Sequence, residues 1–152
     1  MAGKNDNFEF ELLRLVFNGF STGTVGQLAT TAGTTTVWLA LQTADPGDAG
    51  STANEGGYTA YTRVQTMRST AAAGWVVSSG TGATKASASP NAAITFPQVA
   101  TTSTGTFSFF SVYPSSNAGA SLAFYSGSVS PVINFSQNVT PSLTTGSSIT
   151  ED

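Results

Sequence analysis

The sequence of 152 residues contains no cysteine and no histidine, and each absence excludes a kind of chemistry. Without cysteine there are no disulfides, no thiolate metal ligands and no cysteine nucleophile. Without histidine, the commonest general base and the commonest side-chain ligand of transition metals are missing. Catalysis would therefore depend on the few carboxylates or on a serine activated by Lys85, for which nothing in the sequence marks a partner, and we expect neither a cofactor nor enzymatic activity.

Charge is also scarce. Charged residues make up 9% of the chain, against about 25% in a typical globular domain. The 5 basic residues are dispersed and form no run along the sequence, so we expect no binding to nucleic acid, which requires a basic patch. No charged residue stands between Lys85 and Glu151. Ser and Thr together account for 44 residues, so hydroxyl groups must keep much of the surface hydrated.

Long apolar runs are absent as well. No segment contains the roughly 20 uninterrupted apolar residues of a membrane span, so we expect no membrane partner. The N-terminal sequence "MAGKNDNFEFELLRLVF" has acids within its apolar stretch and no small-residue cleavage site. It therefore does not predict a secretory signal, and we expect synthesis in a cytoplasm.

One helix is predicted, within an N-terminal arm of residues 1–20. Asp6 and Glu9 have the spacing of a capping box, and Gly19 provides a C-terminal stop. Two apolar stripes run along this helix: Phe8, Leu12, Leu15 and Val16, and Phe10, Leu13, Phe17 and Phe20. A helix packed on one side needs a single stripe. The second stripe leaves two alternatives, burial in the chain's own core or contact with a neighbouring subunit. The interface candidates on this helix are Phe8, Phe10, Leu13 and Phe17.

From residue 36 onward the pattern changes to short strands. The first, residues 37–42, alternates Val37, Leu39 and Leu41 with Trp38, Ala40 and Gln42. Further strands are predicted at 58–68, 74–79, 92–96, 105–114, 121–127, 132–135 and 147–150. The apolar side of 105–114 changes after Phe109, which predicts a bulge or a change of sheet. Eight strands separated by turn residues predict a mainly β fold, a β-sandwich or jelly-roll-like domain over residues 36–152.

The stretch "ADPGDAG" holds two of the few acids. Asp45 and Asp48 flank a Pro-Gly pair, which is strong turn chemistry. A calcium loop would need more oxygen ligands at set spacing. Paired carboxylates could also act on a sugar, although nothing in the sequence marks a pocket around them. We favour a structural turn, with a bound cation and acid–base chemistry as the alternatives.

Glu55 precedes the strand that carries Arg63. The economical interpretation is an ion pair that pins the loop, and an exposed pair of this kind stabilises a fold by at most about 1 kcal/mol. In so uncharged a chain these two residues could also make contacts with a partner. Among the aromatic residues, Trp38 and Tyr61 are further interface candidates, because one small domain has difficulty burying all of them and aromatics are enriched at interfaces.

Four segments in order carry a resemblance: "LALQTADPGDAG", "NEGGYTAYTRV", "GWVVS" and "NAAITFP". Together they resemble a family of small structural proteins of tailed bacteriophages. The resemblance covers residues 36–97 and continues more loosely through "SFFSVYPSSNAGASLAFYSG" and "VTPSLTTGSSITED". Relatives often carry His at the position of Gln42, so a role of that His does not transfer. The N-terminal helix lies outside the shared core.

The resemblance implies a virion component without enzymatic activity, made in the cytoplasm of the host bacterium. Members are described both as capsid cement (decoration) proteins and as tail-fibre proteins. No repetitive shaft or coiled coil is visible, so we favour a cement protein on the capsid surface. Its partner would be the major capsid protein, and it would form a homo-oligomer, with a trimer favoured and the N-terminal helix at the three-fold. The alternative is a tail-fibre or tail-tip component that binds a host receptor or glycan through exposed Trp38, Tyr58 and Tyr61.

Overall fold

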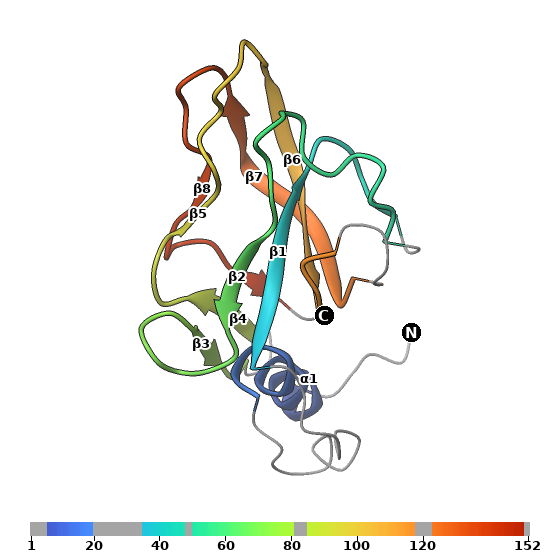
Figure 1. Ribbon diagram of the computed structural model, residues 1–152. Helices are drawn as coiled ribbons and strands as arrows, with labels where there is room; N and C mark the ends of the chain where they lie inside the picture. The colour runs from blue at the N-terminus through green and yellow to red at the C-terminus, as the bar shows by residue number, and fades with distance from the viewer. Residues whose placement is uncertain (1–5, 20–34, 48–49, 81–84, 118–122, 151–152) are drawn as a thin grey trace. The chain divides into compact units, whose positions relative to one another are not determined.

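The computed structural model describes residues 6–19, 35–47, 50–80, 85–117 and 123–150 (Figure 1). Contacts divide the chain into two compact units. Unit 1 comprises Met1–Thr36, Met67–Ala93 and Thr144–Asp152, and unit 2 comprises Val37–Thr66 and Ile94–Leu143. In the part of the chain that the structure describes, no helix is long and apolar enough to cross a membrane.

The described residues form one helical segment followed by nine strands (Figure 1). The strands are β1 (Thr36–Gln42), β2 (Val64–Met67), β3 (Trp75–Ser78), β4 (Ser87–Pro90), β5 (Ile94–Thr95), β6 (Gly105–Tyr113), β7 (Tyr125–Phe135), β8 (Ser142–Leu143) and β9 (Ile149–Thr150). The predicted mainly β fold with one N-terminal helix is confirmed. The jelly-roll topology stays a prediction.

The strands are arranged in three sheets. The largest has the order β2-β1-β6-β7, and β5 pairs with β8 in a two-stranded sheet. The third sheet has the order β3-β4-β9 and belongs to unit 1. The pairings of β1 with β6 and of β6 with β7 are antiparallel. Within unit 2, the aromatic side chains described below connect the two-stranded sheet to the four-stranded one.

The predicted irregularity in the sixth strand is present, but the extra residues lie on its partner. Phe107 pairs with Ile133, whereas Phe109 pairs with Ser128. Four residues of β7, from 129 to 132, therefore stand opposite Ser108 alone. A bulge of this kind bends the strand and interrupts its ladder of hydrogen bonds. The predicted segments 121–127 and 132–135 therefore meet in one strand, which begins at Tyr125 and has a bulge in its middle; residues 121 and 122 of the first segment lie outside the described part.

The strand predicted at 58–68 is wrong over its first half. Only Val64–Met67 forms a strand. Gly56 and Gly57 have positive φ angles of 76° and 158°, and the Tyr61 N–H donates to the Tyr58 carbonyl in a turn. This turn directs both tyrosine rings inward, against the aromatic side chains of unit 2.

The N-terminal helical segment begins as α1 (Asp6–Leu13) and continues as the π-helical turn η1 (Arg14–Asn18). Gly19 ends it with φ 67°, and its N–H donates to the Arg14 carbonyl. A glycine suits this left-handed position because it has no Cβ to clash, so the predicted stop is confirmed. The side chain of Asp6, which the capping box requires, lies outside the described part.

Unit 1 has a core that this helix completes. Leu13 and Phe17 are fully buried, and the Phe17 ring lies 4.5 Å from that of Trp75 on β3, measured between centroids. Arg68 closes the end of the helix, because its guanidinium donates to the carbonyls of Leu15 and Val16. The helix is therefore an integral part of unit 1.

Candidate functional site

Of the two acids predicted to form a turn, Asp45 and Asp48, the structure describes Asp45. The Asp45 side chain is exposed, and its Oδ1 accepts a hydrogen bond from the Gly47 N–H at 2.9 Å. Gly47 has φ 62°, as a turn glycine does. Asp48 lies outside the described residues. Among the residues that are described, no group of three or more carboxylates gathers that could hold a metal ion.

Glu55 and Arg63 form a bidentate ion pair. The Nε of Arg63 donates to Glu55 Oε1 and its Nη2 donates to Oε2, both at 2.8 Å. The side chains are 1% exposed for Arg63 and 5% for Glu55. The sequence-based estimate assumed an exposed pair, and burial changes the energetics. Removing one partner of a buried pair leaves an uncompensated charge, which costs about 3–5 kcal/mol.

Arg63 also holds the segment that follows β6. Its Nη1 donates to the carbonyls of Ser115 at 2.9 Å and Asn117 at 3.1 Å. The guanidinium carbon lies 3.5 Å from the centroid of the Tyr113 ring, a cation–π contact. A planar guanidinium satisfies several acceptors and one aromatic face at once, which lysine cannot do. Arg63 thus joins three separate segments of unit 2.

A buried polar contact lies beside this arginine. Gln42 on β1 is fully buried, and its Nε2 donates to the hydroxyl of Ser111 at 2.7 Å and to that of Tyr113 at 3.3 Å. Sequence reasoning noted Gln42 only for its departure from the family pattern and missed this role. Alternation within the strand could have placed Gln42 beside Trp38 and Ala40, but could not show that both faces of the strand are covered.

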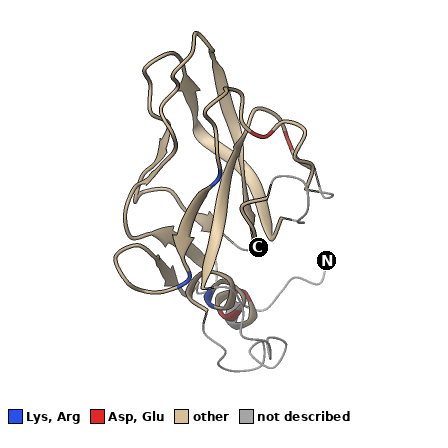
Figure 2. Ribbon diagram, in the orientation of Figure 1, with Lys and Arg blue, Asp and Glu red and all other residues tan. Residues whose placement is uncertain are grey.

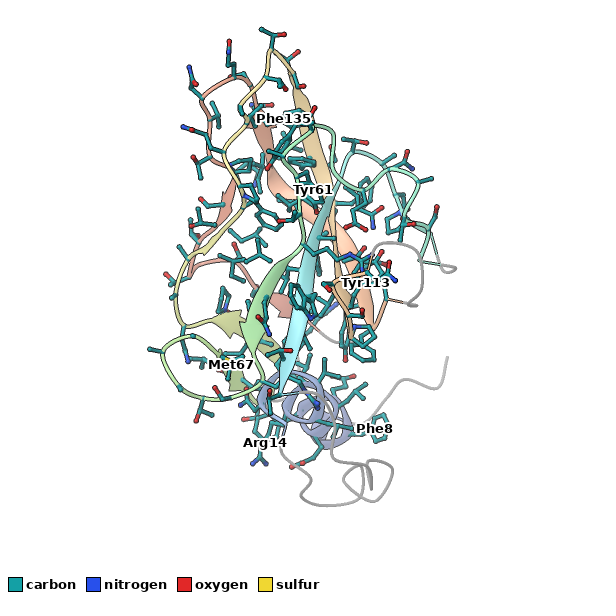
Figure 3. All side chains as sticks on the ribbon, in the orientation of Figure 1. Phe8, Arg14, Tyr61, Met67, Tyr113 and Phe135 are labelled. Carbon is teal, nitrogen blue, oxygen red and sulfur yellow. The ribbon has the colours of Figure 1, made fainter. Side chains whose placement is uncertain are left out.

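Five aromatic side chains of unit 2 pack against one another. Figure 3 labels two of them, Tyr61 and Phe135. They are Tyr58, Tyr61, Phe96, Phe107 and Phe135. The rings of Phe107 and Phe135 are 4.6 Å apart, and Tyr61 stacks on Phe96 at 6.0 Å. Because Phe96 follows β5 directly, this cluster connects the two sheets of unit 2.

Both tyrosine hydroxyls in the cluster bond to backbone. The Tyr58 hydroxyl donates to the Pro97 carbonyl at 2.6 Å, and the Tyr61 hydroxyl accepts from the Leu41 N–H at 2.7 Å. Burial raises the pKa of Tyr61 strongly, and it raises the pKa of Tyr58 as well. Tyr58 is only 8% exposed. Tyr58 is therefore not an exposed platform for a glycan, because its ring is buried in the aromatic cluster, and Tyr61 is half-buried against the same rings.

The remaining interface candidates fall into two groups, buried and partly exposed. Leu13 and Phe17 are used in the core of unit 1, so they are not available to a partner. Phe10 is half-buried, with the Arg14 guanidinium carbon 5.3 Å from the centroid of its ring. Phe8 is 40% exposed, and Trp38 is half-buried on β1 across from Tyr113.

The comparisons with known proteins give one family. Residues 21–147 match the family model described as "Podophage GP4 fiber I protein gp80". A search of curated proteins finds no match. The family match confirms the expected relationship to structural proteins of phages, although it does not single out cement proteins. The match covers most of the chain, so the protein belongs to the podophage GP4 fiber I protein gp80 family and is a structural component of a bacteriophage virion.

Proposed function

We propose that this chain is a component of a podophage tail fibre and that it has no enzymatic activity of its own. The observation that carries the proposal is the family match over residues 21–147, whose description names a fibre protein. That description supports the fibre alternative of the sequence analysis better than the capsid cement expectation.

The geometry of the polar residues is consistent with a structural role. The described carboxylates of unit 2 are used internally, Asp45 in a turn and Glu55 in a buried ion pair. Arg63 and Gln42 likewise direct their donors at other parts of the same unit. These contacts stabilise a rigid module that can be incorporated into a larger assembly.

Two measurements on purified virions test the proposal. Quantitative mass spectrometry gives the copy number of this chain relative to the major capsid protein, and immunogold labelling gives its location. We expect a few copies per virion and label at the tail. A copy number comparable to that of the major capsid protein, with label over the head, would overturn the fibre proposal in favour of a cement protein.

A further inference from the structure

The helical segment of unit 1 ends in a set of hydrogen bonds to its last carbonyl groups. A helix leaves its last four carbonyls without partners inside the helix. The Gly19 N–H donates to the carbonyl of Arg14. The Arg68 guanidinium donates to the carbonyls of Leu15 and Val16. The next carbonyl along the helix is bonded by the side chain of the last helical residue.

That last residue is Asn18, whose side chain is half-buried. In the amide orientation that its neighbours require, its Nδ2 donates to the carbonyls of Phe17 at 3.3 Å and Trp75 at 3.2 Å. Trp75 is the first residue of β3, and its ring packs on that of Phe17. The Asn18 amide therefore connects the end of the helix to the strand against which the helix packs.

Asn18 and Gly19 are the only Asn-Gly pair in the sequence. The backbone nitrogen that follows an asparagine can attack its side chain, and glycine hinders this approach least because it has no side chain. The Gly19 nitrogen loses its proton and bonds to Asn18 Cγ, ammonia leaves, and a succinimide ring forms. Water then opens the ring. Breaking the bond from nitrogen to Cγ gives aspartate, and breaking the bond from nitrogen to the main-chain carbonyl carbon gives isoaspartate.

The folded helix end opposes the first step of this reaction. The Gly19 N–H is engaged with the Arg14 carbonyl, so the nitrogen is not free to attack. The Asn18 amide is held by the carbonyls of Phe17 and Trp75, which restricts the movement of Cγ toward that nitrogen. The reaction therefore requires the helix end to open, and the population of the open state sets its rate.

The product does not fit the place of the amide. A carboxylate accepts hydrogen bonds and donates none, so at position 18 it would set negative oxygens against the carbonyl oxygens of Phe17 and Trp75. It would also lie at the C-terminal end of the helix, where the macrodipole disfavours negative charge. The acids Glu9 and Glu11 of the same helical segment lie nearer its start (Figure 2). Both effects favour the open helix end.

We propose that Asn18–Gly19 is a deamidation site that acts as a slow switch on unit 1. The folded helix end protects the asparagine, and conversion to aspartate or isoaspartate releases that end from β3. The change is one-way because ammonia is lost, so it accumulates as the protein ages. This inference concerns unit 1 and does not depend on the fibre proposal.

Reaction rates test the protection. Mass spectrometry of proteolytic fragments follows deamidation of Asn18 in the full chain at fixed temperature and pH. We expect the reaction to be at least about tenfold slower in the folded chain than in the chain unfolded in urea. Arg68→Met removes the donors to the Leu15 and Val16 carbonyls and should accelerate the reaction. Arg14→Met, the matched control, leaves those donors in place and should not.

Equal rates in the folded and unfolded chains would overturn the proposal, as would equal acceleration by Arg68→Met and Arg14→Met. If Arg68→Met fails to fold, the wild-type chain in urea below its unfolding transition replaces it. The rate at Asn18 should then rise with urea, because urea increases the population of open states, and a constant rate would contradict the proposal.

Hydrogen exchange tests the consequence. Asn18→Asp reproduces one product, and Asn18→Ala removes the amide without adding charge. We expect the Gly19 amide to exchange at least about tenfold faster in Asn18→Asp than in the wild type, with Asn18→Ala between them. Wild-type chain that has aged and been separated by charge gives the same measurement if Asn18→Asp fails to fold. Exchange as slow as in the unmodified wild type would show that the product leaves the helix end in place, and the switch would be excluded.

Discussion

The two units of this chain build their interiors by different means. Unit 1 relies on a helix near the start of the chain, whose Leu13 and Phe17 are buried and whose Phe17 packs against Trp75. Unit 2 relies on an aromatic cluster and on the buried Glu55–Arg63 ion pair. The helix of unit 1 precedes residue 21, where the family match begins, whereas unit 2 lies entirely within the match. The family pattern therefore contains the whole interior of one unit and only part of the other.

The chain provides a separate reporter for each unit. Of its two tryptophans, Trp75 lies in unit 1 and Trp38 in unit 2, and all four tyrosines lie in unit 2. Variants with one tryptophan replaced by phenylalanine would follow the unfolding of each unit by fluorescence. The predictions below use these reporters to test whether the two interiors are as different as they look.

The largest expected effect is on unit 2. Arg63→Met leaves the Glu55 carboxylate buried without its partner, so we expect the free energy of unfolding to fall by about 3–5 kcal/mol. The double variant Arg63→Met with Glu55→Gln should be less destabilised than the single one, because no uncompensated charge remains. Denaturant unfolding followed by Trp38 measures both.

The control for this prediction is Glu11→Gln, which weakens the more exposed Glu11–Arg14 pair and should cost less than about 1 kcal/mol. Equal losses for the two pairs would mean that burial does not distinguish them. The comparison between the units would then lose its electrostatic basis.

The next effect is on unit 1. Phe17→Ala removes the ring that packs on Trp75 and leaves a cavity, so we expect the free energy of unfolding to fall by about 3–5 kcal/mol. Unfolding followed by Trp75 fluorescence checks it. Phe8→Ala, at the 40% exposed position of the same helix, should change stability little. If both variants behave alike, the helix does not complete the core.

A smaller effect concerns a tight turn in unit 1. A Cβ on Gly74 would lie 1.9 Å from the Ser69 carbonyl oxygen, which also accepts a hydrogen bond from the Trp75 N–H. We expect Gly74→Ala to cost about 1–3 kcal/mol through backbone displacement. A Cβ on Gly146, in the same unit, would lie 3.6 Å from its nearest neighbour, the Thr144 hydroxyl oxygen. The stability of Gly146→Ala should therefore be within about 0.5 kcal/mol of that of the wild type. Thermal unfolding of the two variants tests this difference, and equal melting temperatures would contradict it.

The smallest effect is a dependence on alkaline pH that only unit 2 should show. Burial raises the pKa of Tyr58 and Tyr61 above the ordinary value of 10.0. Stability from keeping these phenols neutral is fully present below that value and is lost as pH rises above it, because the unfolded chain ionises first. Tyr61→Phe should make the stability of unit 2 depend less steeply on pH. The lost hydrogen bonds of the hydroxyl should lower the free energy of unfolding by about 1 kcal/mol at neutral pH.

Unfolding midpoints measured from roughly pH 8 to pH 11 with each tryptophan reporter would test this last prediction. We expect the Trp38 signal to shift with pH and the Trp75 signal to stay constant over the range. A parallel shift of both signals would show that the two units unfold as one.

Much of the fold follows from the sequence, and the exceptions have identifiable causes. β1 and the helix with its Gly19 stop were predictable from local periodicity and from the need for a left-handed residue. β4 and β8 were missed because Ser87–Pro90 and Ser142–Leu143 contain no β-branched or aromatic residue, and the alternation of Ser with Ala and Pro in β4 covers only four residues. β4 pairs with the preceding strand β3 and with the distant β9, and β8 pairs with the distant β5, so neither is defined by its own residues alone.

Among the polar residues of unit 2, too, local pairings were predictable and contacts between distant residues were not. The Glu55–Arg63 pair was predictable because its members are 8 residues apart. Its burial was not, because burial requires Tyr113 and the carbonyls of Ser115 and Asn117, which the sequence places far away. Gln42 was missed for a related reason, since its partner Ser111 is 69 residues distant.

The contacts of Arg63 also bear on the order in which unit 2 folds. Its pair with Glu55 closes a short loop, whereas its bonds to the Ser115 and Asn117 carbonyls span 52 and 54 residues. Closing a longer loop costs more chain entropy, so the local pair can form before the distant carbonyls arrive. A variant that removes only the distant contacts would then act mainly on the unfolding rate, and Arg63 would help to set how long the finished module survives in the virion.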